Sequence, residues 1–483
     1  MSPQSIQFLF ALAKFRLHAV LAILMIVPLI TACGRRQQLD PAWSHPETFA
    51  HSKEALNSTF GIVQLNGMPV CVDGSDYYFL GTDGADWKKK TFLAPISVAN
   101  SLFLPDPAST RFILQEGSVR DGTLHGAFVF CSLDPESGIR KLYDRNVALE
   151  PQELFGEIRK SRNEQPVEKI WRQQYGPPQI KPSSGCFGWG VSLGEAVHVP
   201  YTVECSAFYG SRKEAGGSGP AQTGMLSSTG DHSRWTKVKL FDVRTFAQGI
   251  FASRDNLYFL ANRIGEQDLK TWGLWCVRMP RTEAAQPAAE LVAHTFCHTV
   301  FGKYSAVTSG ETIHLIWLDE RHERNSALRV LRSGGGPPGE ANFEIYYCKR
   351  DDSGTEWTKE VLLSKGIDFA FAPQMAVDGE SIVVVWAGHR RDRDKTYAEF
   401  HPSDIYFTTS RDAGKTWAAT TRATDNAKSG SVSGRPQVVL HNGVIHLFYI
   451  RGKPRENVVA PGLRLLNQPP WDIIYQHRLF PEG

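Results

Sequence analysis

Several charged side chains in the C-terminal half of this sequence could do chemistry. They follow or flank apolar stretches, and they are Asp319, Glu320, Arg321, Arg390, Arg435 and Arg451. Pairs of carboxylates beside arginines can perform glycosidic acid/base chemistry, and guanidinium groups bind carboxylates through two parallel hydrogen bonds. The competing interpretation is that runs such as "DERHER" and "GHRRDRDK" are solvated loop charges that form weak salt bridges. Both roles stay open at this point.

A second group with chemical potential is the octet "SRDAGKTW", which contains the carboxylate of Asp412. Each residue type in the octet also has a mechanical use. Ser410 and Asp412 can accept hydrogen bonds from turn amides, and Gly414 supplies a backbone angle that other residues resist. Thr416 begins the next strand, and Trp417 buries a large ring against the sheet. The octet therefore predicts a turn, with Asp412 as a structural residue.

The elements that must position these residues form a repeat. Segments 304–321, 369–390 and 433–452 each contain a short strand, a turn that ends in glycine, and an apolar strand that ends in an aromatic residue. The turns are Ser309-Gly310, Asp378-Gly379 and Asn442-Gly443, which suit tight hairpins. Two of the segments are followed by the similar stretches "EIYYCKRDDSGTEW" and "DIYFTTSRDAGKTW", whose final tryptophans are 60 residues apart.

Four antiparallel strands that recur at such a spacing predict the blades of an all-β β-propeller. Weaker copies near 68–92, 124–149, 184–241 and 245–285 bring the total to seven blades, with six as the alternative. After the last repeat, "DIIYQHRL" is followed by the end of the sequence and not by a fourth strand. A segment before Asn57 could supply that strand, close the ring and remove its open edges.

The N-terminal residues predict a lipoprotein signal over residues 1–32. Basic residues precede the apolar run Ala19–Ile30, which at 12 residues is too short to span a bilayer. Cys33 follows the residues "ITA", and this junction resembles the lipobox of bacterial lipoproteins, which implies acylation of Cys33. The alternative is an ordinary signal peptide with a chance cysteine. Gly34 after the cysteine would imply the outer membrane in a Gram-negative host.

The remaining chain divides into residues 33–56, a tether that could also hold the ring-closing strand, and residues 57–483, the propeller. Within it, residues 151–183 read as a polar insertion with a helical stretch at its start. Removing residues 1–32 removes Lys14 and Arg16 and lowers the net charge from +3 to +1. Such a near-neutral chain carries no sequence-wide signal for nucleic acid or for anionic lipid.

The cysteines and histidines give no sign of a metal or a cofactor. No cysteine spacing matches C-x-x-C, so neither a zinc ribbon nor a redox motif is expected. In an exported chain the local pairs Cys186/Cys205 and Cys276/Cys297 could form disulfides. The histidines His198, His314 and His446 fall inside predicted strands, where a half-buried imidazole with a hydrogen-bond partner is the commoner role.

The octet resembles the Asp box, S-x-D-x-G-x-T-W, of the sialidase superfamily, also called the bacterial neuraminidase repeat. All five specified positions match, and a degenerate copy at Asp352, Gly354 and Trp357 lies one repeat earlier. The resemblance covers residues 300–480, with remote echoes that end at Trp87 and Trp235. It implies that the octet lies between the third and fourth strands of a blade, on the rim away from the active site.

In that family an arginine triad binds the substrate carboxylate, beside a tyrosine nucleophile with its glutamate and an aspartate acid/base. The family's Arg-Ile-Pro strand has no match in the first repeat. The nearest likeness is Arg435-Pro436 in the last repeat, with no residue between them. The resemblance therefore extends to the fold more firmly than to sialidase catalysis.

Three functions remain as hypotheses, because a fold does not specify its chemistry. The first is a lipid-anchored, extracytoplasmic propeller that binds a glycan or an envelope protein without turnover. The second is an exo-sialidase or related glycoside hydrolase with a divergent site, and the third is an assembly factor for a membrane complex. We expect a monomer that uses no cofactor or metal, contacts the membrane through its lipid anchor, and binds no nucleic acid.

Overall fold

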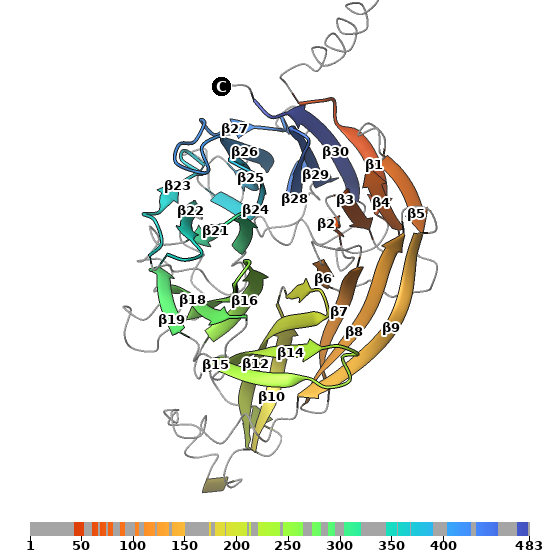
Figure 1. Ribbon diagram of the computed structural model, residues 1–483, viewed down its shortest axis with the longest axis vertical. Coiled ribbons are helices and arrows are strands. Elements are labelled where there is room, and N and C mark those ends of the chain that lie inside the picture. Colours follow the sequence, from red (N-terminus) through yellow and green to blue (C-terminus); the bar gives the residue numbers. More distant parts are fainter. Residues whose placement is uncertain are drawn as a thin grey trace, which may run out of the picture.

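The chain folds into a ring of antiparallel sheets (Figure 1). The computed structural model describes residues 43–52, 60–65, 68–73, 76–80, 87–91, 102–105, 111–120, 123–134, 138–149, 173–174, 179–188, 190–209, 212–213, 221–241, 245–263, 273–281, 288–294, 304–319, 344–354, 356–367, 369–389, 403–426, 431–452 and 471–481. Within these residues the strands form seven sheets, each with a main path of four strands. This is the architecture of a seven-bladed β-propeller, as the repeat predicted.

Six blades are built from strands that are consecutive in the sequence. Blade 1 holds β2 (Phe60–Leu65), β3 (Met68–Asp73), β4 (Asp76–Leu80) and β5 (Trp87–Thr91). Blade 2 holds β6 (Leu102–Pro105), β7 (Arg111–Arg120), β8 (Thr123–Asp134) and β9 (Gly138–Leu149). Blade 3 holds β10 (Gln179–Phe187), β11 (Val191–Leu193), β12 (Ala196–Tyr209), β13 (Arg212–Lys213), β14 (Ala221–Thr229) and β15 (Thr236–Phe241).

The C-terminal blades are the most regular. Blade 4 holds β16 (Thr245–Ala252), β17 (Asn256–Arg263), β18 (Gly273–Pro280) and β19 (Ala288–Ala293). Blade 5 holds β20 (Tyr304–Ser309), β21 (Thr312–Asp319), β22 (Glu344–Asp351) and β23 (Val361–Leu362). Blade 6 holds β24 (Phe369–Asp378), β25 (Ser381–His389), β26 (Asp404–Ser410) and β27 (Thr421–Arg422).

Blade 7 joins the two ends of the chain. It holds β28 (Val432–His441), β29 (Val444–Gly452) and β30 (Trp471–Leu479), and its outer strand is β1 (Glu47–Ser52), which pairs with β30. The junction begins ahead of β1, where the Ser44 amide donates to the His477 carbonyl at 2.9 Å and the His477 amide donates to the Ser44 hydroxyl at 2.9 Å. The N-terminal segment thus occupies the position that a fourth strand would need.

The inner strands of the blades meet around the centre of the ring. Contacts run in the order β28, β2, β6, β11, β16, β20, β24 and back to β28. The second and third strands are the most apolar, because both of their faces pack against neighbouring blades. All seven residues of β26 are buried, and in β21 every residue after Thr312 is buried. The core is therefore a series of interfaces between blades.

The "SRDAGKTW" octet forms the turn between β26 and β27. The Ser410 hydroxyl accepts a hydrogen bond from the Gly414 amide at 2.8 Å. The Asp412 carboxylate accepts from the Thr416 amide at 2.8 Å and from the Thr416 hydroxyl at 2.6 Å. These bonds hold the pKa of Asp412 well below its usual range. Asp412 is thus engaged in holding a turn, with Gly414 at a φ of 79°.

Two disulfide predictions are wrong. Cys276 is a buried free thiol, so it forms no bond with Cys297, which lies outside the described residues. In the β10–β12 ladder, Cys186 is opposite Thr202 and Cys205 is opposite Pro182. That offset of three residues places the two Cα atoms roughly 10 Å apart along the strands, beyond the reach of a disulfide.

The predicted helix at 151–162 lies outside the described residues. In the described part of the chain, no helix has the length and apolar character to cross a membrane.

Candidate functional site

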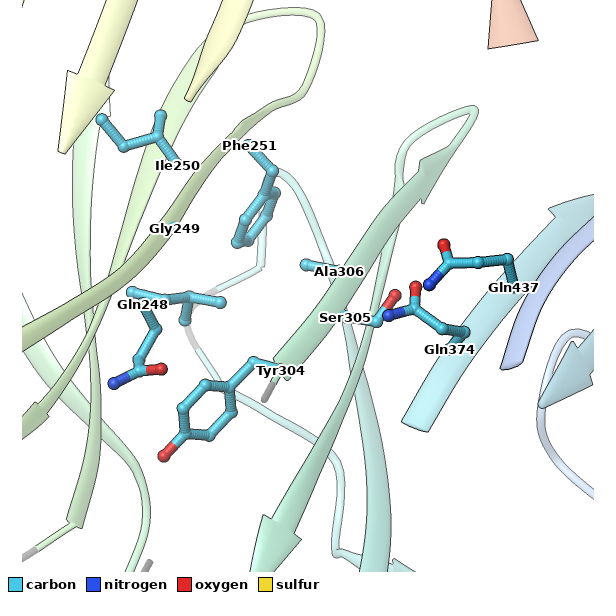
Figure 2. A pocket seen from close by; sticks show the side chains of 10 residues that line it. Gln248, Gly249, Ile250, Phe251, Tyr304, Ser305, Ala306, Gln374 and Gln437 are labelled. Carbon is cyan, nitrogen blue, oxygen red and sulfur yellow. The ribbon is translucent and has the colours of Figure 1, made fainter. Parts of the chain in front are cut away.

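A cavity of about 200 Å³ opens among the inner strands of blades 4 to 7. Figure 2 shows the side chains that line it. The lining residues are Gln248, Gly249, Ile250, Phe251, Leu260, Tyr304, Ser305, Ala306, Gln374 and Gln437. We call this cavity the central pocket. It combines groups from blades that are distant in the sequence, which is how a propeller assembles a site.

A β-bulge orients the side-chain amide of Gln374 in blade 6, and a matching β-bulge orients that of Gln437 in blade 7. In β24 the ladder with β25 shifts register between Phe371 and Gln374, and in β28 the ladder with β29 shifts between Gly434 and Gln437. A bulge of this kind adds unpaired residues and re-aims the side chain that follows. Proline fits at both places because it has no amide hydrogen to donate to a ladder.

The residue ahead of each of these prolines is left-handed. Ala372 has a φ of 51° and Arg435 a φ of 48°. Such a conformation costs a residue other than glycine roughly 1–2 kcal/mol. The left-handed conformation recurs at matched positions of blades 6 and 7, which indicates that it is part of the bulge. In both blades the bulge presents a glutamine side chain to the central pocket. Strain of this kind is common at ligand sites.

A third amide, that of Gln248, comes from blade 4. There the β16–β17 ladder shifts register between Ala247 and Gly249, so that Gln248 is the bulged residue. In blade 5 the corresponding inner strand contributes the Ser305 hydroxyl and the ring of Tyr304, whose phenol oxygen is itself buried. Figure 2 shows Gln248 and Tyr304 on one side of Ala306, with the amides of Gln374 and Gln437 on the other.

The pocket is polar and neutral. None of its described lining residues is charged, and each glutamine amide offers two hydrogen-bond donors and an acceptor. Among the residues that the structure describes, none hydrogen-bonds to the amide groups of Gln374 or Gln437. These two half-buried amides are therefore available to a ligand that both donates and accepts.

Two aromatic rings complete the lining. Phe251 and Tyr304 are half-buried, and Figure 2 shows both of them at the pocket. The Phe251 ring is held in place by stacking on Tyr258, with ring centroids 5.1 Å apart and planes 9° from parallel. A fixed ring beside hydrogen-bonding amides provides both an apolar surface and polar partners for a bound molecule.

Asp319, a predicted site residue, lies at the end of β21 and outside the pocket lining. It is fully buried, and the Trp317 indole donates a hydrogen bond to its carboxylate at 3.1 Å. Across the ladder it is opposite Glu344, which accepts a hydrogen bond from the Tyr346 hydroxyl at 3.0 Å. The two carboxylates are thus held by donors from their own blade.

Arg435 and Arg451 both lie in blade 7. Arg435 occupies the left-handed bulge position of β28, and burial lowers the pKa of its guanidinium group. Arg451 is the penultimate residue of β29 and is opposite Ser433 and Asp472 in the two neighbouring ladders. Like Asp319 in blade 5, neither arginine is among the described residues that line the central pocket. Glu320, Arg321, Arg390 and Cys33 lie outside the described residues.

Sequence reasoning missed the glutamines that line the pocket. A signal was present, because the alanine-proline-glutamine of blade 6 and the arginine-proline-glutamine of blade 7 occupy matched positions of the repeat. Proline inside an apolar strand indicates a bulge or an edge. On an inner strand, a polar residue directly after such a bulge is a candidate for a central site.

The histidines predicted to lie in strands have hydrogen-bond partners there. His314 bonds through Nδ1 to the Tyr347 hydroxyl at 2.8 Å, and His446 bonds through Nδ1 to the Tyr475 hydroxyl at 2.9 Å. Burial lowers the pKa of His314 to about 4 and that of His446 to about 3. Within the described ranges, no group of three or more histidine, cysteine, aspartate or glutamate side chains could hold a metal ion.

Comparison with known proteins identifies no family for this chain. No protein-family model matches the chain, and a search of curated proteins finds no match. Among solved structures, the chain is similar to the sialidase of Trypanosoma rangeli, at 11% identity and a TM-score of 0.35, over 76% of this chain and 54% of the sialidase. The chain thus spans about half the length of that enzyme.

Two other solved structures with different activities are similar to the chain to the same low degree. The polysaccharide lyase Uly1 is 8% identical with a TM-score of 0.38, over 90% of this chain and 92% of the lyase. The lignostilbene dioxygenase of Pseudomonas brassicacearum is 12% identical with a TM-score of 0.38, over 73% of this chain and 70% of the enzyme. At such values the assignment of the fold rests on the strand topology, and no activity follows.

Proposed function

We propose that the protein is a lipid-anchored, extracytoplasmic propeller whose central pocket binds the end of a neutral glycan without turning it over. The observation that carries this proposal is the lining of the pocket, where three glutamine side chains and the Ser305 hydroxyl lie beside the aromatic rings of Phe251 and Tyr304. Sugar hydroxyl groups donate and accept hydrogen bonds, and a glutamine amide can also do both.

The pocket's size fits a small ligand or the terminal unit of a larger one. Its volume of about 200 Å³ is below the roughly 300–1,000 Å³ of pockets that enclose drug-sized molecules. Phe251 and Tyr304 offer apolar faces against which the C–H face of a sugar ring can pack. A glycan end that enters the pocket would leave the rest of the chain in solvent.

The absence of charge among the described lining residues favours a neutral ligand. A bound carboxylate or phosphate would lose hydration without gaining a cationic partner from them. For the same reason these residues include no pair of acid and base that could cleave a glycosidic bond. The glycoside hydrolase hypothesis therefore depends on candidates other than these lining residues, among them Glu320, Arg321 and Arg390, which lie outside the described residues.

The test is a binding and turnover experiment on the chain from Gly34 onward, with neutral and sialylated oligosaccharides. We expect calorimetry to detect binding of neutral glycans and chromatography to recover them intact. Hydrolysis that is lost in an Arg321→Ala variant would instead support the hydrolase hypothesis. No binding to any glycan of the panel would contradict the proposal and direct attention to protein partners.

A further inference from the structure

The outer strands of blades 1, 2 and 3 carry an unusual concentration of positive charge. These strands are β5, β9 and β15, with the sequences "WKKKT", "GIRKLYDRNVAL" and "TKVKLF". Together they contain eight lysines and arginines and one aspartate. We call these three strands, with the turn 230–235 that leads into β15, the basic rim. Figure 1 shows β5 and β9 along the outside of the ring, and β15 is the edge strand of its sheet.

The outer strands of the other four blades differ in charge. β1, β19, β23 and β27 together contain one arginine and two glutamates. Lysines on an exposed edge strand protect against pairing with other chains, but that need is common to every blade. Edge protection therefore does not account for the higher number of lysines and arginines in the outer strands of these three adjacent blades.

The basic rim is continuous and solvent-facing. β5 contacts β9, and the Arg145 guanidinium donates to the Asp231 carbonyl at 3.1 Å, which links β9 to the turn before β15. Lys88, Lys141 and Arg234 are exposed. Lys141 pairs with Asp144 at 2.8 Å, and Asp231 in the turn carries the second negative charge of the rim. The rim thus presents a net positive surface along the side of the ring.

An apolar side chain accompanies the charges. Leu142 in β9 is 42% exposed, between Lys141 and Tyr143 in the sequence. Leu142 is unpaired because the β8–β9 ladder shifts register between the pairs Phe130–Tyr143 and Cys131–Lys141. Its exposed apolar side chain can enter the boundary between lipid headgroups and acyl chains.

The path of the chain brings the basic rim toward a membrane. Trp43 is ten residues after Cys33, a distance that an extended chain spans in at most about 35 Å. The strand β1 that follows lies against β5, where the rings of Phe49 and Trp87 are 5.8 Å apart and nearly perpendicular. An acylated Cys33 would therefore hold β5, the first strand of the rim, close to the bilayer.

We propose that the basic rim docks on a bilayer surface of anionic phospholipids. Docking through the side of the ring would leave both faces of the propeller, and with them the central pocket, open to solvent. This inference shares the anchor at Cys33 with the proposed function, and it is independent of the ligand of the pocket. Each lysine or arginine near an anionic surface contributes about 1 kcal/mol to binding, so that three exposed residues support a measurable affinity.

The test uses the chain from Gly34 onward, which keeps every described residue and lacks the acylated cysteine. Its co-sedimentation is measured with vesicles of phosphatidylcholine alone and with vesicles that contain phosphatidylglycerol. We expect binding to the anionic vesicles only, and a decrease with added salt because screening weakens such contacts. The rim variant Lys88→Glu/Lys141→Glu/Arg234→Glu should bind roughly a hundredfold less well.

The matched control is Lys359→Glu/Lys365→Glu/Lys415→Glu, which changes the net charge equally at exposed positions of blades 5 and 6. We expect it to retain most of the binding, and thermal unfolding will confirm that both variants fold. No binding of the unaltered chain to anionic vesicles would overturn the proposal. So would equal losses in the two variants, which would show a net-charge effect without a docking surface. Glycan binding by the rim variant should be unchanged, which separates this outcome from failure of the proposed function.

Discussion

The ring of Trp43 lies edge-on to the ring of Phe407, with centroids 5.1 Å apart and planes at 89°. Trp43 comes from the N-terminal segment, just ahead of β1 in blade 7, and Phe407 is on the third strand of blade 6. Ring contacts join other neighbouring blades in the same way. Trp87 with Tyr475 and Trp417 with Tyr347 are also edge-on, whereas Trp235 and Phe128 are stacked. A tryptophan before or at the start of one blade's outer strand thus packs on an aromatic residue of the preceding blade.

Because Trp43 closes the last of these contacts, we expect Trp43→Ala to weaken the whole ring. Trp43 is half-buried, so the loss in free energy of unfolding should be roughly 2–3 kcal/mol, below the ~3–5 kcal/mol typical of a fully buried aromatic residue. Denaturant titration would measure it. If removal of residues 1–46, which leaves β1 in place, left stability unchanged, Trp43 and Ser44 would contribute nothing to closure of the ring.

A comparison of three blades explains two buried histidines. His314 and Tyr347 in blade 5 correspond to His446 and Tyr475 in blade 7, whereas blade 6 has Val383 and Phe407 at these places. The imidazole and the hydroxyl are therefore present together or absent together. A buried hydroxyl without a partner is costly, and replacing both groups by apolar ones avoids that cost.

We therefore predict that His314→Val and Tyr347→Phe are not additive. Each single change removes a partner from a buried polar group and should lower the free energy of unfolding by about 1–3 kcal/mol. The double variant, which copies blade 6, should lose less than the two single losses combined, with a coupling of about 1 kcal/mol. Additive losses in chemical denaturation would show that the hydrogen bond contributes nothing to stability.

Stability should fall as the pH is lowered from 6.5 toward 4. Burial lowers the pKa of His198 and of His314 to about 4 in the folded protein. The unfolded chain has histidine pKa values of about 6.5, so in this window it binds more protons than the folded chain. The stability is fully present above pH about 6.5 and is lost as the pH falls through the window.

The measurement is the midpoint of thermal unfolding as a function of pH. A variant in which His446→Val and Tyr475→Phe copy blade 6 removes one of the buried histidines and should show a shallower decline between pH 6.5 and 4. Parallel curves for the variant and the unaltered chain would contradict the assignment of His446 as a buried neutral imidazole.

Gly414 and Gly443 form a matched pair for testing the octet. Both have left-handed backbone angles, with φ of 79° and 71°. A Cβ at Gly443 would meet open space, whereas a Cβ at Gly414 would overlap the phenol oxygen of Tyr347 in the neighbouring blade. Gly443→Ala should lower the free energy of unfolding by roughly 1–2 kcal/mol. Gly414→Ala should lower it by about 1–3 kcal/mol more.

Equal effects of the two alanine substitutions would contradict the close contact between blades 5 and 6. Urea unfolding of the two variants, measured side by side, decides the question. The control matters because the backbone strain is common to both positions, and only the overlap with Tyr347 differs.

The fold could be predicted from the sequence because short local patterns identify each repeat. Glycine turns such as Asp378-Gly379, apolar second strands and the octet recur at a fixed spacing, and each favours the same four-stranded unit. The missing strand after Leu479 was visible as an incomplete last repeat, and β1 occupies that place.

The lining of the central pocket could not be read in the same way. Which face a strand residue presents depends on register, and a shift of one residue reverses it. The bulges before Gln374, before Gln437 and at Gln248 all change register inside a strand. Charged residues after the second strands, such as Asp319, were easier to notice, yet the described ones do not line the pocket.

The central claim is that the amides of the pocket bind a neutral glycan. The most direct measurement is a calorimetric titration of the glycan that binds best into the unaltered chain and into Gln374→Leu/Gln437→Leu, with Thr421→Leu on the outer strand β27 as control. Because each lost hydrogen bond contributes about 1 kcal/mol, we predict a roughly tenfold to hundredfold weaker affinity for the double variant and no change for the control. An unchanged affinity in the double variant would show that the ligand, if bound at all, lies elsewhere.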